Sequence, residues 1–169
     1  MGPGTDPQTR LGPLVDRRQR EVVERHVTDA VSRGARVLAG GSPRPGPGAY
    51  YPATVLSGCT PQMLVMREET FGPVAPVQVV DGFEAGLQAA AASPYGLGAS
   101  VLTGSIAHAN QAWHELPVGT VKVNGVFGGA PGGAAHPRGI SGQGFGYGPE
   151  LLDELVVTKV VHIGTPPQA

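Results

Sequence analysis

The chain has 169 residues, which is the length of one domain on the usual range of roughly 100–200 residues per domain. Although 27 glycines and 17 prolines are present, 40% of the residues are hydrophobic and the formal net charge is −1, which excludes a charge-rich disordered chain. The balance of 12 basic against 13 acidic residues leaves no electrostatic footprint for nucleic acid or an anionic membrane surface. We therefore expect a globular fold with many turns and neither of these partners.

The compartment is predicted from three features. The uncharged stretch 85–113 is interrupted by Pro94 and by several polar residues, so we do not expect it to cross a bilayer. The first residues lack a charged region followed by an apolar run, the pattern of a secretory signal. The single cysteine, Cys59, forms no internal disulfide. Together these features favour the cytoplasm.

The first half of the chain predicts a helix followed by short strands. Between Asp16 and Gly34 the apolar residues recur every three or four positions, which is the spacing of one helical face. Asp16 can cap the start of this helix, and Gly34 can end it. Strands are expected at 36–39, 50–56 and 74–80.

The second half continues the alternation of helices and strands. Asp81 and Glu84 have the spacing of a capping box for a helix through about residue 92, and Ser105 can cap a helix to about residue 115. Strands are expected at 98–103 and 119–124. Such alternation is typical of βαβ units. It predicts an α/β fold with a largely parallel sheet flanked by helices.

The C-terminal part differs from this pattern. Residues 125–148 include ten glycines, and residues 149–154 fit one or two helical turns. The segment 155–163 (LVVTKVVHI) is the most strand-like in the chain, and an exposed apolar strand tends to pair with another edge.

Three candidate sites are weak on the residues alone. The glycines from Gly142 to Gly148 fail the dinucleotide fingerprint, because Tyr147 stands where the third glycine belongs and no acidic residue follows at the required distance. Cys59 has no histidine, lysine or predicted helix start close in sequence, so a structural role is favoured over a nucleophilic one. The five histidines show no metal-ligand spacing, and no metal site is predicted.

The segment 66–76 (MREETFGPVAP) is the most specific candidate. Adjacent carboxylates at Glu68 and Glu69 precede Phe71 and a Gly72-Pro73 turn into a strand. This arrangement can present an acceptor and an aromatic face to a ligand. A solvated acidic turn beside a packed phenylalanine is the alternative, and the residues alone favour this alternative.

Several segments in register resemble the C-terminal part of the NAD(P)-dependent aldehyde dehydrogenase superfamily. The resemblance extends from Asp6 to about Val161. It is carried by GPLV at 12–15, GARVLAGG at 34–41, PATVL at 52–56, REETFGPV at 67–74, SPYGL at 93–97, GTV at 119–121 and SGQG at 141–144. The REETFGPV and SPYGL segments are highly specific when they occur together.

The resemblance implies roles for particular residues. Glu69 takes the position of a carboxylate that binds the nicotinamide ribose hydroxyls of NAD or NADP, and Phe71 packs at the nicotinamide end. Asn124 and the loop 125–136 lie near the substrate entrance. Residues 1–154 correspond to part of the catalytic domain, and residues 155–169 correspond to an oligomerisation strand and tail.

The resemblance also implies what this chain lacks. In the family, the nucleotide-binding domain, the general-base glutamate and the nucleophilic cysteine precede the position of Asp6, so no catalytic residue is assigned here. Lys122 replaces a tryptophan, and Phe145-Gly146 replaces an arginine-glutamate pair. We expect a truncated or separately encoded aldehyde dehydrogenase that is inactive alone. It would form a homodimer or larger assembly, or join a separate dehydrogenase subunit. A non-enzymatic interaction protein and an enzyme of altered chemistry are the alternatives.

Overall fold

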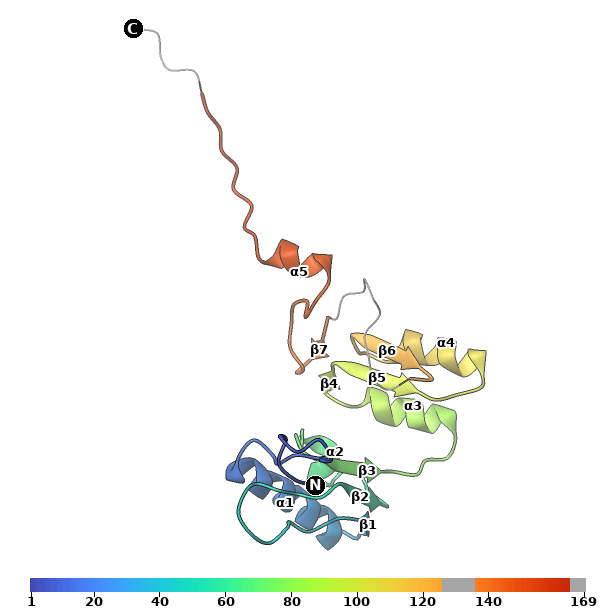
Figure 1. Ribbon diagram of the computed structural model, residues 1–169. Helices are drawn as coiled ribbons and strands as arrows, with labels where there is room; N and C mark the ends of the chain where they lie inside the picture. Colours follow the sequence, from blue (N-terminus) through green and yellow to red (C-terminus); the bar gives the residue numbers. More distant parts are fainter. Residues whose placement is uncertain (126–135, 165–169) are drawn as a thin grey trace. The chain divides into compact units, whose positions relative to one another are not determined.

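The structure is a computed structural model that describes residues 1–125 and 136–164 (Figure 1). The chain divides into two compact units, residues 1–80 and 81–169, and each is described by itself. Part of the predicted glycine-rich loop 125–148, namely residues 126–135, lies outside the described residues. No helix among the described residues is long and apolar enough to cross a membrane.

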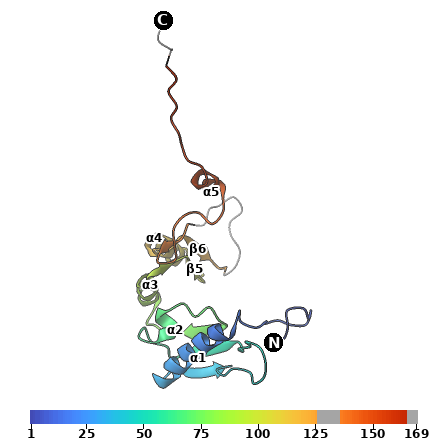
Figure 2. The same ribbon diagram turned by 90° about the vertical axis from the view of Figure 1, so that its left-hand side faces the viewer.

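The first unit packs helix α1 (Arg17–Ser32) against a three-stranded sheet (Figures 1 and 2). The sheet has the order β1 (Arg36–Ala39), β2 (Thr54–Ser57), β3 (Val74–Val77). β2 pairs antiparallel with β1 and parallel with β3. The short helix α2 (Leu64–Arg67) lies between β2 and β3 in the chain. β2 is therefore the central strand, and its Thr54 and Leu56 are buried.

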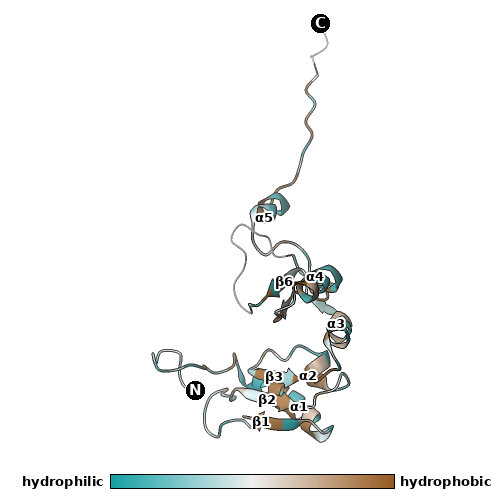
Figure 3. Cartoon of the chain, turned by 90° about the vertical axis from the view of Figure 1, so that its right-hand side faces the viewer, coloured by the Kyte–Doolittle hydropathy of each residue, from teal (hydrophilic) through white to brown (hydrophobic). Residues whose placement is uncertain are grey.

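Helix α1 forms where the spacing predicted it. The Asp16 carboxylate accepts a hydrogen bond of 2.8 Å from the Gln19 amide, which satisfies one of the free donors of the first turn. Gly34 follows the helix with a φ of 99°, a backbone conformation that glycine adopts without strain. The buried face of α1 packs into a core that also contains Tyr51 and Leu56, and Figure 3 shows the apolar residues of β2 and α2 beside it.

The second unit is built on a parallel pair of strands, β5 (Gly98–Val101) and β6 (Thr120–Val123). Helices α3 (Phe83–Ala91) and α4 (Ile106–Glu115) contribute Leu87 and Ala112 to its small core. The Ser105 hydroxyl caps α4 by accepting a hydrogen bond from the His108 amide, as predicted. Two further elements are short: β4 (Tyr95–Gly96) pairs antiparallel with β7 (Arg138–Gly139), and α5 (Pro149–Glu154) follows.

The prediction of one largely parallel sheet is not confirmed, because the described strands form three small sheets with both parallel and antiparallel pairs. Whether a helix connects two paired strands explains why both parallel and antiparallel pairs occur. α2 lies between β2 and β3, and α4 lies between β5 and β6, and both pairs are parallel. No helix lies between β1 and β2, and the intervening loop returns the chain antiparallel.

Two local predictions also differ from the structure. Helix α3 is capped by Gly82, with a φ of 93° and no side-chain cap, so the capping box of Asp81 and Glu84 is not formed. Residues 156–164 have no regular secondary structure, so the predicted strand 155–163 is not formed in the single chain. A strand needs a partner edge for its backbone hydrogen bonds, and none of the described strands pairs with this segment.

Candidate functional site

The candidate site is the turn at residues 68–73, which connects α2 to β3. Glu68 ends α2 by donating its backbone N–H to the Leu64 carbonyl over 2.9 Å. Its φ of −118° and ψ of 150° then start an extended segment. Side chains of an extended segment alternate between its two sides. Glu68 and Thr70 are therefore expected on one side, and Glu69 on the other.

The contacts of His26 match this alternation. The imidazole of His26, on α1, is 1% exposed. Its Nδ1 lies 3.1 Å from the Thr70 hydroxyl oxygen, and its Nε2 lies 3.4 Å from a carboxylate oxygen of Glu68. Glu69, between these two residues, is exposed. The turn thus directs two of its side chains toward α1 and keeps Glu69 at the surface.

Phe71 is held in an unusual conformation. Its φ is 43°, in the left-handed region that residues other than glycine adopt infrequently, and 73% of the residue is exposed. The Gln19 side-chain amide donates to the Thr70 carbonyl over 2.7 Å and to the Phe71 carbonyl over 3.2 Å. These bonds fix the backbone from the α1 side. The ring of Phe71 is therefore left at the surface on an anchored backbone.

Gly72 follows because the turn approaches α1 too closely for a side chain. A Cβ at position 72 would lie 2.4 Å from Cγ2 of buried Val23. The Gly72 carbonyl accepts a hydrogen bond of 2.8 Å from the Val74 amide, and the Pro73 carbonyl accepts one of 2.8 Å from the Thr54 amide. The turn is thus joined to the central strand β2 on its other side.

Asp29 fixes the start of the segment. One of its carboxylate oxygens accepts a hydrogen bond of 2.8 Å from the Leu64 amide, and the other lies 2.7 Å from Nε of Arg33. The hydrogen bond from Arg33, followed by that from the Leu64 amide, lowers the pKa of Asp29 below its ordinary value. Gln19, His26 and Asp29 together hold residues 64–71 against α1.

Sequence reasoning found the turn but not the residues that hold it. It assigned His26 no role in the turn, and Gln19 and Asp29 were not singled out. The available signal was the helical spacing of 7 and then 3 residues between these polar positions, which puts them along one side of α1.

Asn124 lies in the second unit at the end of β6 and has a φ of 55°. Its side-chain oxygen accepts a hydrogen bond of 2.8 Å from the Thr103 amide, and its side-chain nitrogen donates to the Thr103 carbonyl over 2.9 Å. The amide group thus links the end of β6 to the residues after β5. A role near a substrate entrance stays a prediction, and most of the loop that follows lies outside the described residues.

The remaining candidates carry no assembled site. Cys59 is 3% exposed, with Sγ 3.8 Å from the Leu56 carbonyl oxygen. Within the described ranges, no three acidic, histidine or cysteine side chains lie together as metal ligands would. In the 142–148 loop, the Phe145 amide donates to the Glu154 carboxylate over 2.9 Å, so this loop contacts α5.

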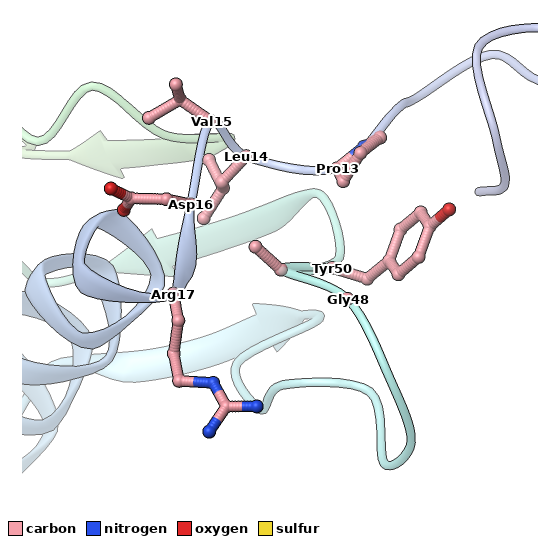
Figure 4. A pocket seen from close by; sticks show the side chains of 8 residues that line it. Pro13, Leu14, Val15, Asp16, Arg17, Gly48 and Tyr50 are labelled. Carbon is pink, nitrogen blue, oxygen red and sulfur yellow. The ribbon is translucent and has the colours of Figure 1, made fainter.

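A hollow of about 360 Å³ lies elsewhere in the first unit, between residues 13–17 and 48–50 (Figure 4). The Leu14 amide donates to the Ala49 carbonyl over 2.9 Å and joins its two sides. Asp16, one of its polar side chains, already caps α1. None of the site residues predicted from the sequence lines this hollow, so the turn at 68–73 remains the candidate site.

Comparison with known sequences gives a family. Residues 1–161 match the aldehyde dehydrogenase family. The chain is 34% identical over 172 residues to succinate-semialdehyde dehydrogenase (NADP+) 1 of Mycobacterium ulcerans strain Agy99, which covers 97% of this chain and 36% of that protein. It is 37% identical over 165 residues to the putative succinate-semialdehyde dehydrogenase (NADP+) 2 of Mycobacterium tuberculosis strain H37Rv. This match covers 95% of this chain and 32% of that protein.

Solved structures agree. Lactaldehyde dehydrogenase from Escherichia coli matches with a TM-score of 0.88 and 37% identity, over 95% of this chain and 34% of that one. Betaine aldehyde dehydrogenase from Staphylococcus aureus, in complex with NAD+, matches with a TM-score of 0.86 and 31% identity. This match covers 99% of this chain and 34% of that one. The chain belongs to the aldehyde dehydrogenase family, which confirms the resemblance. It spans about a third of the length of these relatives.

Proposed function

We propose that this chain forms the part of an NAD(P)-dependent aldehyde dehydrogenase that holds the nicotinamide and its ribose. The observation that carries the proposal is the turn at 68–73, where Glu69 and Phe71 are exposed on a backbone that α1 anchors through Gln19. Because the turn is anchored before a ligand binds, binding does not have to order its exposed groups, and the entropic cost of binding is smaller.

The residues present fit this ligand. A carboxylate offers two acceptor oxygens, and a ribose offers two neighbouring hydroxyl donors, so Glu69 is suited to the diol. The ring of Phe71 offers an aromatic surface of the kind that packs against a flat heteroaromatic ring. When bound, NAD or NADP supplies the hydride acceptor for the oxidation of an aldehyde. In this chain, Glu69 would orient the ribose and Phe71 would limit the positions of the ring.

The relatives support a nicotinamide dinucleotide as the cofactor, but they differ in which dinucleotide they are named for or contain. The Staphylococcus aureus structure holds NAD+, and the mycobacterial relatives are named for NADP+. Both dinucleotides have the same nicotinamide and ribose, so the proposed roles of Glu69 and Phe71 apply to either. The names of the relatives include lactaldehyde, betaine aldehyde and succinate semialdehyde. We therefore propose aldehydes as a class.

The chain on its own is proposed not to oxidise aldehydes. Covalent aldehyde oxidation needs an accessible thiolate, and Cys59 is the only cysteine in the sequence. Because its thiol is buried in the core of the first unit, it is not available as a nucleophile. The nucleophile and the general base would come from polypeptide that corresponds to the remaining two thirds of the relatives. Incubating the purified chain with NAD+ or NADP+ and succinate semialdehyde, and measuring absorbance at the reduced-nicotinamide band, checks this proposal.

Binding at the turn is tested by titrating the isotope-labelled chain with nicotinamide mononucleotide, which carries only the nicotinamide half of the dinucleotide. The account predicts saturable changes in the backbone NMR signals of residues 68–73 at millimolar concentrations. A 2′-deoxy analogue, which lacks the diol, serves as the matched control and is expected to bind more weakly. Changes spread elsewhere, or none at saturating ligand, would contradict the proposal.

A second candidate function, an interaction protein on the same scaffold, is favoured by the C-terminal segment. In residues 155–163, Val157 is 95% exposed and Val160 is 91% exposed. Contiguous exposed apolar side chains mark interaction surfaces. We propose that this segment pairs with a second copy of the chain or with a separate dehydrogenase subunit. The two functions are compatible, because the segment and the turn share no residues.

A further inference from the structure

Resting on the proposed function, we propose that His26 is a positioning residue for the nicotinamide end of the site, because its imidazole contacts the residues on both sides of Glu69. The resemblance assigned roles to Glu69, Phe71 and Asn124, and His26 is not among them. Its place in the structure comes from α1, more than 40 positions earlier in the chain than the turn.

The geometry distinguishes His26 from an ordinary core residue. Both ring nitrogens face the turn: Nδ1 is within hydrogen-bond distance of the Thr70 hydroxyl oxygen, at 3.1 Å, whereas Nε2 makes no hydrogen bond and lies 3.4 Å from a carboxylate oxygen of the half-exposed Glu68 side chain. A buried polar ring costs free energy unless its nitrogens have partners, so packing alone would be served better by an apolar ring. The imidazole therefore contributes a directional contact that a hydrophobic side chain would lack.

The two contacts restrain Glu69 through its neighbours. Glu68 and Thr70 are one residue away on either side, and in an extended segment their side chains share the face opposite that of Glu69. Because Thr70 is hydrogen-bonded to α1 and Glu68 lies against the same imidazole, rotation of the segment that would turn Glu69 inward is opposed. Gln19 holds only backbone carbonyls, of Thr70 and Phe71. His26, by contrast, contacts the side chains of Glu68 and Thr70.

Loss of the imidazole should loosen the turn and leave the core filled. His26→Phe keeps a planar ring but removes both nitrogens. We expect the backbone order parameters of residues 69–71 to fall from about 0.85, typical of a rigid backbone, to below about 0.6. If the binding-competent arrangement is then populated about a third of the time, the dissociation constant for nicotinamide mononucleotide rises about threefold.

The experiment uses ¹⁵N relaxation and nicotinamide mononucleotide titration on the full chain, on His26→Phe and on three further variants. His26→Asn retains a side-chain amide and is expected to recover part of the order. Thr70→Val removes the hydroxyl while leaving His26 in place, and so tests the same contact if His26→Phe fails to fold. His108→Phe is the matched control, because it is the same substitution at a histidine of the second unit, where His108 stacks on Phe83.

The outcomes separate this inference from the proposed function. Order parameters at 69–71 that stay at the wild-type value in folded His26→Phe, or in Thr70→Val, would overturn the positioning role. An equal fall in the control would also overturn it, since the effect would then be general. If the turn loosens as expected but the wild-type chain binds no nicotinamide mononucleotide, the proposed function fails and the positioning role stands.

Discussion

Gly72 and Val23 are in such close contact that a Cβ at position 72 would lie 2.4 Å from Cγ2 of Val23. Gly72→Ala is therefore expected to push the turn away from α1 or to displace a fully buried valine. Overpacking of this kind costs about 1–3 kcal/mol. Chemical denaturation of the variant and the wild type measures the loss of unfolding free energy.

Gly12→Ala provides the control for Gly72→Ala. Position 12 lies in the same unit, and a Cβ there would meet nothing within 4 Å. This variant should keep the wild-type unfolding free energy within about 0.5 kcal/mol. Equal effects of the two substitutions would show that the contact with Val23 does not constrain the turn.

Asp29 predicts a pH dependence of stability. Its pKa is lowered in the folded chain from an ordinary value of 3.8, mainly by the hydrogen bond from Arg33. The native state therefore favours the carboxylate. Its stabilisation is fully present above the unfolded pKa and is lost as the pH falls through the lower, folded pKa. The melting temperature of the wild type should exceed that of Asp29→Asn at pH 6, and the gap should narrow below about pH 4.

The exposed Asp81 provides a comparison for the same chemical change. Asp81→Asn is the matched substitution and measures the effect of the Asp-to-Asn change itself. A gap for Asp29→Asn that stays constant from pH 6 to pH 3 would contradict the linkage to the carboxylate.

Two substitutions of Asn124 are expected to lower the unfolding free energy by different amounts. Asn124→Ala removes the two hydrogen bonds to Thr103 and places a residue with a Cβ at a φ of 55°. About 2 kcal/mol of stability should be lost. Asn124→Gly loses the same hydrogen bonds but tolerates the backbone conformation, so it should cost about 1 kcal/mol less. Thermal unfolding checks the order, and equal losses would show that the backbone conformation contributes nothing.

The C-terminal segment predicts self-association. The full chain should be a dimer or larger assembly in size-exclusion chromatography with light scattering. In an extended segment, Val157 and Val161 lie on one face, and both are exposed in the single chain. Their double replacement by lysine should give a monomer, because two charges would be buried in the interface. A monomeric wild-type chain would refute the proposal.

The elements of this fold were predictable where a local signal decides them. The 3.6-residue spacing and the cap of Asp16 predicted α1, and Ser105 predicted the start of α4. The sheet was not predictable in the same way, because the direction of each strand depends on the connection to its partner. The segment 155–163 shows the same limit: its composition favours a strand, but strand formation requires a pairing edge that the described part of the chain does not provide.

The candidate site was predictable only in part. The turn itself was found because Glu68, Glu69 and Phe71 form a specific motif, and the resemblance supplied the roles. The contribution of α1 was not found, because the contacts of Gln19 and His26 join positions more than 40 residues apart. Such contacts depend on how α1 packs, which hydrophobic spacing does not reveal in detail.

Glu69 tests the central claim most directly. The dissociation constant for nicotinamide mononucleotide should rise about tenfold in Glu69→Gln, since charge-assisted hydrogen bonds to the ribose diol are weakened. Glu84→Gln, an equivalent change on an exposed residue of α3, should leave the wild-type value unchanged. Measured by NMR titration of the full chain, the tenfold loss confined to Glu69→Gln is the predicted result. Equal affinity of the Glu69→Gln variant and the wild type would contradict the assignment of this turn as the nicotinamide riboside site.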